Sequence, residues 1–181
     1  MAKKIVKSPP CEWYMPLSIF LYGGSDEGKT KTLVKLYEKL TKTTFTKRNA
    51  VFPPFSYTKN AVTVTIYICT VGDDAKNTLN NIKDLDKNNQ KQRIDIFITA
   101  VNNEFDNMMP NSLSVAQDYC TGLYSEISRC AKFALWVRKL NPNVLEPNYK
   151  AEDNPASQKT SIADANRLKK IIDFYIDNKL I

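Results

Sequence analysis

The stretch "IFLYGGSDEGKTKTL", residues 19–33, decides the fold of this chain, because it joins an apolar run to a helical pattern through a glycine-rich turn. Three of the five glycines in the 181-residue chain fall within it. The apolar run, residues 16–22, is typical of a buried strand. Residues 29–40 repeat apolar side chains at helical spacing, so the sequence predicts a strand, a turn and a helix in this order.

The turn has the spacing of a phosphate-binding loop. It matches the pattern G-x-x-x-x-G-K-[ST], from Gly23 through Gly28 to Lys29 and Thr30. Glycine lets the backbone curl so that its N–H groups point at a phosphate, and the N-terminus of the following helix favours the same anion. In such a loop the lysine bridges the β- and γ-phosphates, and the hydroxyl holds Mg²⁺. The residues expected to contact the nucleotide are Gly23, Gly24, Ser25, Asp26, Glu27, Gly28, Lys29, Thr30 and Lys31.

With this motif between a strand and an amphipathic helix, the sequence resembles the P-loop nucleoside triphosphatase superfamily. The resemblance covers the order of strands and helices along the chain, whereas its specific motif covers only residues 23–30. It implies ATP or GTP as the ligand and Mg²⁺ as the cofactor. It also implies hydrolysis of the nucleotide or transfer of its phosphoryl group as the activity.

The rest of the chain alternates apolar runs with helical patterns. Such alternation indicates a parallel sheet covered on both faces, whose ligands bind at the carboxyl ends of the strands. We therefore expect an α/β fold of the P-loop NTPase type, a three-layer α/β/α sandwich around a mainly parallel sheet of about five strands. Strands are predicted at 16–22, 61–72, 94–101 and 133–140, an edge strand or loop at 50–60, and helices at 29–40, about 74–90, 113–130 and about 160–178.

The domain organisation predicted from the sequence is a single domain over residues 1–181. Residues 1–15 form an N-terminal extension, and residues 141–158 form a long loop within the domain. The last helix opens on "SIAD", in which Ser161 and Asp164 have the spacing of a capping box. The N-terminus has no apolar segment of a signal peptide, and no apolar run approaches the roughly 18 residues of a membrane span. We therefore expect a cytoplasmic protein that does not bind membranes.

Composition excludes several classes of site. The chain has no histidine, which excludes imidazole bases, histidine triads and most zinc sites. Its four cysteines lack C-x-x-C spacing, and we interpret them as thiols in a reducing compartment.

The charges around the turn leave two points open. Asp26 and Glu27 are unusual beside a polyanion, and they either point to solvent or act on an acceptor or on water. The chain carries a net charge of +7, and its lysines suit a solvated helix face better than a nucleic-acid surface, because no aromatic residues lie between them. The lysines at helical spacing are Lys31, Lys35, Lys39 and Lys42.

P-loop enzymes hold Mg²⁺ with a further acid at the end of a neighbouring strand. Here the strand at 61–72 ends on Cys69 and Thr70, and Asp73 is the nearest carboxylate, so we assign it the metal and a catalytic role beside Lys29. Asp74 is the second choice. The alternative for Asp73 is that it caps the following helix.

The guanine-reading motifs of small GTPases are incomplete in this chain. Cys69 stands in place of the aspartate of D-x-x-G, and only Lys139 remains of N-K-x-D. ATP is therefore the default nucleotide, by elimination.

Three functions follow from the resemblance. The first is Mg²⁺-dependent hydrolysis of ATP or transfer of its phosphoryl group, in which Arg138 or Arg48 could supply a second cation. The second is a slow nucleotide-dependent switch that acts through a protein partner. The third is a small-molecule or nucleotide kinase, whose acceptor would be a further partner.

Overall fold

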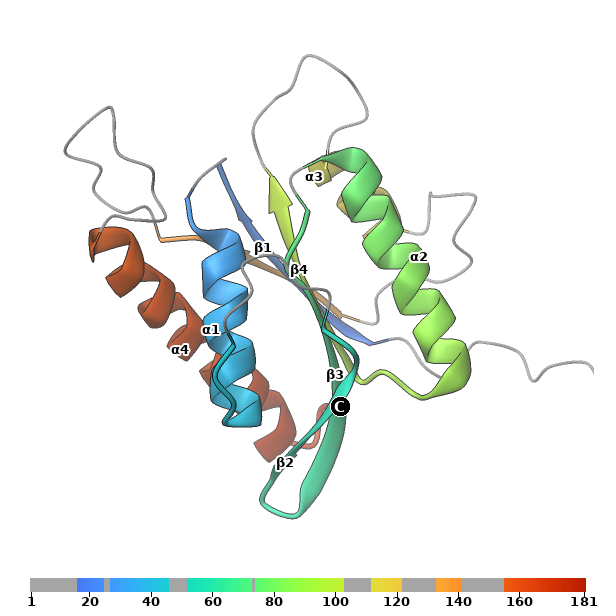
Figure 1. The fold of residues 1–181 in the computed structure, drawn as a ribbon. Coiled ribbons are helices and arrows are strands. Elements are labelled where there is room, and N and C mark those ends of the chain that lie inside the picture. The colour runs from blue at the N-terminus through green and yellow to red at the C-terminus, as the bar shows by residue number, and fades with distance from the viewer. Residues whose placement is uncertain are drawn as a thin grey trace, which may run out of the picture.

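The computed structural model describes residues 16–24, 27–45, 52–72, 74–102, 112–121, 133–140 and 155–181. These form an α/β fold with one five-stranded sheet between two layers of helices (Figure 1). The strands are β1 (Leu17–Gly23), β2 (Phe55–Lys59), β3 (Val62–Cys69), β4 (Ile96–Asn102) and β5 (Phe133–Arg138). The helices are α1 (Lys29–Thr41), α2 (Ala75–Lys91), α3 (Ser112–Thr121) and α4 (Pro155–Asp177).

The sheet has the strand order β2-β3-β4-β1-β5. β1 pairs in parallel with β4 on one side and with β5 on the other, and β3 is parallel to β4. The expectation of a mainly parallel sheet is thus confirmed, although β2 makes the sheet mixed by pairing antiparallel with β3. β4 lies between β1 and β3, so the strand that precedes Asp73 is not a direct neighbour of the strand that leads into the turn at residues 23–30.

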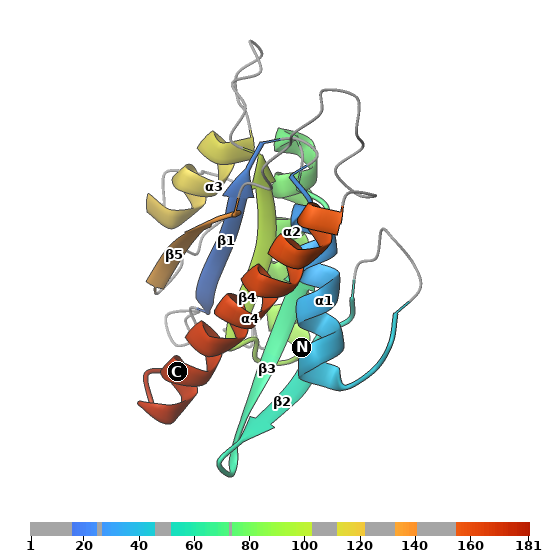
Figure 2. The ribbon, with the colours of Figure 1, turned by 90° about the vertical axis from the view of Figure 1, so that its left-hand side faces the viewer.

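Apolar side chains fill the space on each face of the sheet. On one face, α1 and α4 cover Leu17, Ile19 and Leu21 of β1 together with the matching residues of β3 and β4. On the other face, α2 and α3 cover Phe20 and the side chains beside it. The alternation along β1 places successive residues on opposite faces, and both faces are buried, which explains the unbroken apolar run. Figures 1 and 2 show the two helical layers.

The last helix begins earlier than the sequence predicts. α4 starts at Pro155, so Ser161 and Asp164 lie inside the helix and are fully buried rather than capping its first turn. The predicted capping box is therefore wrong. Of the helix predicted over 113–130, α3 covers Ser112–Thr121, and the remainder lies outside the described residues. Within the described ranges, no helix is long and apolar enough to cross a membrane.

A two-residue turn sets the direction of β2 against β3. Asn60 and Ala61 have φ values of 49° and 63°, both in the left-handed region that suits a tight hairpin turn. Asparagine tolerates this conformation, whereas alanine is strained by about 1–2 kcal/mol. The hairpin makes β2 an antiparallel edge strand without a crossover connection.

We expect Ala61→Gly to stabilise the protein by up to about 1 kcal/mol, because glycine removes the strain of the left-handed conformation and offsets its own loss of chain entropy. Ala61→Ser is the matched control, since serine keeps a Cβ and should give no gain. Urea unfolding of the three proteins measures the difference. A loss of stability in the glycine variant would contradict the turn geometry.

Candidate functional site

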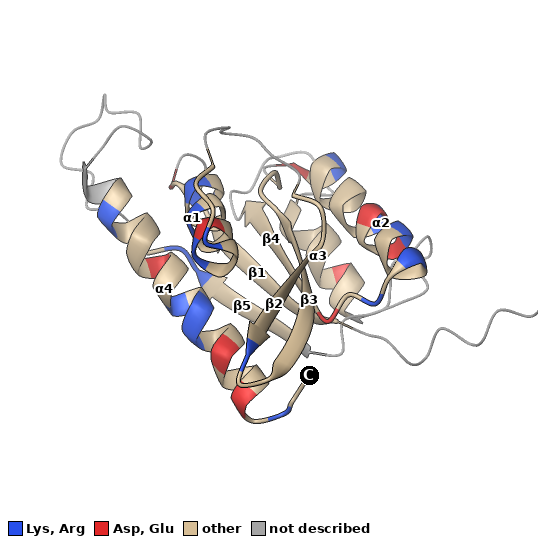
Figure 3. Ribbon diagram, turned by 60° about the horizontal axis from the view of Figure 1, so that its bottom comes forward, with Lys and Arg blue, Asp and Glu red and all other residues tan. Residues whose placement is uncertain are grey.

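The carboxyl ends of the four parallel strands lie at one edge of the sheet, beside the N-terminus of α1 (Figure 1). Charged residues lie mainly on the helices, and within the strands they are limited to Lys59 and Arg138 (Figure 3). By contrast, buried polar side chains collect around the carboxyl edge, where their hydrogen bonds join the strand ends to all four helices. They are Lys29, Thr32, Thr70, Thr78, Asn81, Thr99, Ser112, Lys139, Ser161 and Asp164.

The turn between β1 and α1 depends on glycine at its last position. Gly28 has φ 80° and ψ 27°, in the left-handed region, and it is the residue from which α1 begins. Its carbonyl oxygen accepts hydrogen bonds from the amide and the hydroxyl of Thr32, at 3.0 and 3.1 Å. The Ser161 hydroxyl of α4 lies 3.5 Å from the same oxygen. The first turn of α1 is therefore held from within the helix and from α4.

Lys29 lies at the mouth of this turn with only 4% of its surface exposed. Its ammonium donates to the carbonyl oxygens of Gly23 and Gly24, at 3.0 and 2.5 Å. Both of these acceptors belong to the turn itself. The cation is thus placed beside the backbone of the turn, on the helix end that favours an anion.

Thr30 connects the turn to the end of β3. Its hydroxyl donates to the Thr70 carbonyl at 3.0 Å, which uses the single proton of the group. The two lone pairs of the hydroxyl oxygen are not used by this bond and can accept a proton or ligate a cation. The sequence predicted a metal-binding role for Thr30, and this geometry is compatible with it.

Side chains from three helices hold the segment after β3 at three consecutive carbonyl oxygens. Thr70 accepts from Thr30 of α1 as described, Val71 accepts from the Asn81 amide of α2, and Gly72 accepts from the Ser112 hydroxyl of α3 at 2.7 Å. Gly72 also approaches β4 so closely that an added Cβ would lie 1.8 Å from the Ala100 carbonyl oxygen. The backbone that leads to Asp73 is therefore fixed in place.

Two of these side chains extend the network into β4 and α2. The Asn81 amide also donates to the Thr99 hydroxyl at 3.1 Å. Because the Ser112 proton goes to the Gly72 carbonyl, the Ser112 oxygen accepts hydrogen bonds from the Thr78 hydroxyl at 2.7 Å and from the Asn102 amide at 3.2 Å. Sequence reasoning missed Asn81 and Ser112. The signal was a polar residue on the apolar face of each helix.

A buried ion pair lies on the other side of the turn, after β5. The ammonium of Lys139 and the carboxylate of Asp164 are both fully buried and 3.0 Å apart. Asp164 also accepts the Leu140 amide at 2.9 Å and faces Arg167 at 3.3 Å. Burial lowers the pKa of Lys139, and the carboxylates of Asp164 and Glu27 oppose this shift. Asp164 therefore fixes the end of β5 instead of capping α4, which is why the capping prediction failed.

Lys139 and Glu27 both lie against Gly23. A Cβ added to Gly23 would lie 3.0 Å from the Cβ of Lys139 and 2.2 Å from a carboxylate oxygen of Glu27. The sequence left open whether Glu27 points to solvent. In the structure its carboxylate lies over the first glycine of the turn, and it is only partly exposed. Any side chain at residue 23 would displace both neighbours.

Some of the remaining predicted site residues lie outside the described residues, and others have positions that differ from the prediction. Ser25, Asp26, Asp73 and Arg48 lie outside the described residues, and Lys31 is partly exposed on α1. Asp74, the second choice for the metal, is the N-cap of α2 and accepts the Asn77 amide at 2.7 Å. The interpretation of Asp73 as that cap is therefore wrong.

Two further residues named from the sequence are now placed. Arg138 is exposed at the end of β5. Cys69 is buried, and this burial raises the pKa of its thiol to about 12.

The part of the chain that the structure describes contains no group of three histidine, cysteine, aspartate or glutamate side chains that could hold a metal ion. Mg²⁺ at a phosphate loop does not require such a group, because it keeps several waters and takes one or two protein ligands beside the phosphates. Comparison with protein-family models, with curated proteins and with solved structures found no match to this chain.

The Lys139–Asp164 pair gives a testable prediction. We expect Lys139→Met to lower the free energy of unfolding by up to about 3–5 kcal/mol, because it leaves the buried Asp164 carboxylate with only the partly exposed Arg167 as a cationic partner. The double variant Lys139→Met/Asp164→Asn should recover part of this loss, since asparagine is neutral and can still accept the Leu140 amide. Denaturant unfolding of the wild type, both single variants and the double variant measures the coupling. Additive losses would show that the two side chains do not interact.

Proposed function

We propose that this chain is a P-loop protein that binds ATP with Mg²⁺ and hydrolyses it or transfers its phosphoryl group. The observation that supports this most is the position of Lys29, whose buried ammonium lies against the carbonyl oxygens of Gly23 and Gly24 at the start of α1. Both of these acceptors are neutral backbone oxygens, and the ammonium lies at the positive end of the helix. A phosphate group would supply the negative charge that both the lysine and the helix end favour.

The roles of the other residues follow from their positions. Amide groups of the turn and of the first turn of α1 would surround a phosphate, and Gly28 permits the backbone conformation that directs them. The Thr30 hydroxyl would ligate Mg²⁺ through a lone pair while its proton stays on the Thr70 carbonyl. Asp73 would hold the same ion as the second protein ligand. Mg²⁺ would neutralise charge on the phosphates.

Entry of a phosphate would require Lys29 to exchange carbonyl acceptors for phosphate oxygens. An ammonium has three protons, so it can keep one carbonyl bond while it contacts the ligand. Glu27 would also have to leave Gly23, because a carboxylate beside a polyphosphate is repelled. Lys139 would remain paired with Asp164 and would support the turn from behind.

A nucleotide-dependent switch is the second candidate, and one observation favours it. The segment 70–72 is bonded to Thr30, Asn81 and Ser112, so a change at Thr30 would reach α2 and α3 through direct hydrogen bonds. A switch of this kind would present different helix positions to a protein partner in each nucleotide state. Phosphate release from ATP without any partner separates the two functions. Rapid release supports an enzyme, whereas tight binding with negligible release supports a switch.

Lys29→Ala tests the proposed phosphate site directly. We expect it to weaken binding of a fluorescent ATP analogue by about 100-fold, because a charge-assisted contact of about 3 kcal/mol is lost. Lys39→Ala, on an exposed position of the same helix, is the matched control and should bind normally. Circular dichroism verifies that both variants remain folded. Unchanged affinity in a folded Lys29→Ala protein would refute the proposed site.

Asp73→Asn tests the proposed metal ligand. The Mg²⁺ concentration for half-maximal nucleotide binding should rise about tenfold, because the amide lacks the negative charge that Mg²⁺ prefers. Asp74→Asn provides a close control, since asparagine caps a helix as well as aspartate does and α2 should be preserved. A normal Mg²⁺ response in Asp73→Asn would assign the metal to another acid.

A further inference from the structure

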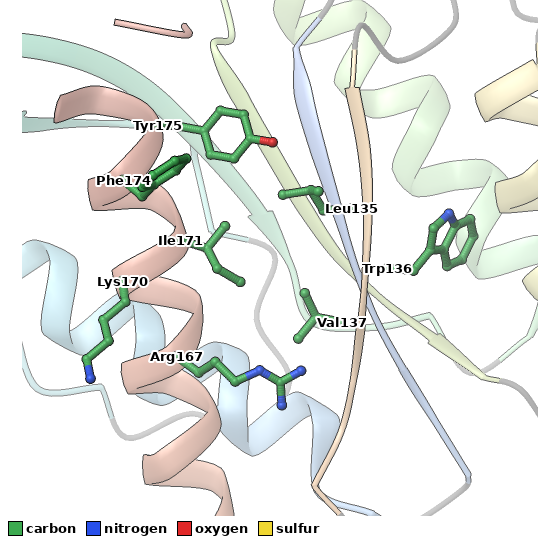
Figure 4. Close-up of a pocket in the computed structure, with 8 residues that line it drawn as sticks. All are labelled: Leu135, Trp136, Val137, Arg167, Lys170, Ile171, Phe174 and Tyr175. Carbon is green, nitrogen blue, oxygen red and sulfur yellow. The ribbon is translucent and has the colours of Figure 1, made fainter. Parts of the chain in front are cut away.

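An open groove lies between α4 and β5, away from the turn at residues 23–30 (Figure 4). Its volume is about 500 Å³. Leu135 and Val137 point into it from β5, and α4 forms the opposite wall. Phe174 of that wall is 57% exposed, an unusual position for a large aromatic side chain. The residues of α4 that give the wall its apolar character are Ile171, Phe174 and Tyr175.

The backbone of β5 borders this groove, and within the described residues no strand pairs with its outer side. β5 is the last strand of the sheet in the described residues, and its Lys139 end bonds to β1 through the Tyr22 carbonyl at 2.8 Å. Backbone groups alternate along a parallel strand, so those of Ala134, Trp136 and Arg138 point away from β1. Arg167 contacts the outward carbonyl of Arg138 at 3.3 Å, which confirms this direction. Among the described residues, the outward amides have no acceptor.

The two edges of the sheet differ in character. β2, at the opposite edge, has the sequence "FSYTK" and ends in a lysine that pairs with Asp173 and Asp177 of α4. β5 reads "FALWVR" and carries no charge before its last residue. Its Trp136 also lies among the residues that line the groove; the side chain is 37% exposed and stacks on Phe20. Polar and charged residues protect an edge strand from pairing, and β5 lacks them.

The charges that line the groove identify the kind of partner. Among the described lining residues, the charged side chains are Lys170 and Arg167, of which Arg167 also contacts the Asp164 carboxylate at 3.3 Å. A second copy of the chain would add two more cations and no carboxylate. A segment with acidic residues beside its apolar ones would instead complement both the wall and its rim.

We propose that β5 accepts an extended segment of an acidic partner protein as an additional strand. Backbone hydrogen bonds to Ala134, Trp136 and Arg138 hold the segment, as in other cases of strand addition. Its apolar side chains enter the groove on alternate positions, and its carboxylates face Arg167 and Lys170. This surface is independent of the proposed nucleotide function, so each can fail without the other.

A synthetic peptide tests the proposal on the full chain. The probe has nine residues in which glutamate, valine, isoleucine, valine and glutamate alternate with threonine, with blocked ends and a fluorescent label. Its glutamates at both ends allow either strand direction. The control peptide has lysine in place of both glutamates. Fluorescence anisotropy should show the acidic peptide binding at least about tenfold more tightly than the basic one, which corresponds to about 1.4 kcal/mol.

Two pairs of variants locate the binding. Ala134→Pro removes an outward amide and leaves the bonds to β1 in place, since proline is tolerated on the open side of an edge strand. Ala134→Pro should weaken binding of the acidic peptide at least about tenfold, whereas the Ala134→Ser protein should bind the peptide with wild-type affinity. Lys170→Glu should remove the preference for the acidic peptide, whereas Lys179→Glu, outside the groove, should retain it. Urea unfolding verifies that each variant is folded.

Several outcomes would overturn the proposal. These are no binding of the acidic peptide at about 1 mM, equal binding of both peptides to the wild type, or unchanged binding in folded Ala134→Pro. A concentration-dependent dimer in sedimentation, abolished by the same variant, would assign the edge to a second copy and would also overturn it.

Discussion

Parallel pairing of β1 with β4 and β5 places the turn that follows β1 between two strand ends at the carboxyl edge of the sheet. In register, Gly23 lies beside Asn102 of β4, and Tyr22 lies beside Arg138 of β5. The N-terminus of α1 is therefore flanked on both sides by strand ends. On the β5 side, the Lys139 amide donates to the Tyr22 carbonyl, a contact that requires β5 beside β1. The proposed phosphate site depends on this position between two strands.

The buried polar groups at this edge destabilise the protein unless each has its hydrogen-bond or ionic partner. A buried polar group without a hydrogen bond destabilises a protein by about 1–3 kcal/mol, and an unpaired buried charge by more. Thr70, Val71 and Gly72 each receive a side-chain donor, and Lys139 receives the Asp164 carboxylate. The edge is thus rigid around the turn, as preorganised binding sites require. The β5 groove differs, because its walls are apolar and its backbone groups face outward.

Local chemistry could be read from the sequence, and long-range pairing could not. The strand, turn and helix around Gly28 were predicted because their residues are adjacent in sequence. The conformation of each of these residues follows from its own side chain. The reversal of β2 required the conformations of Asn60 and Ala61, and alanine gave no signal of a left-handed turn. Asp164 was misread because "SIAD" fits a local pattern, whereas the Leu140 amide that it accepts lies 24 residues earlier. Asn81 and Ser112 have partners on other elements, which periodicity does not identify.

The ion pair of Lys139 and Asp164 also positions α4 on the sheet. It ties the end of β5 directly to the middle of α4, together with the bond from the Leu140 amide to Asp164. Lengthening a connection adds little closure entropy when its ends are already fixed. A longer connection between β5 and α4 would therefore leave the contact of Lys139 with Asp164 available to hold the helix in register with the sheet.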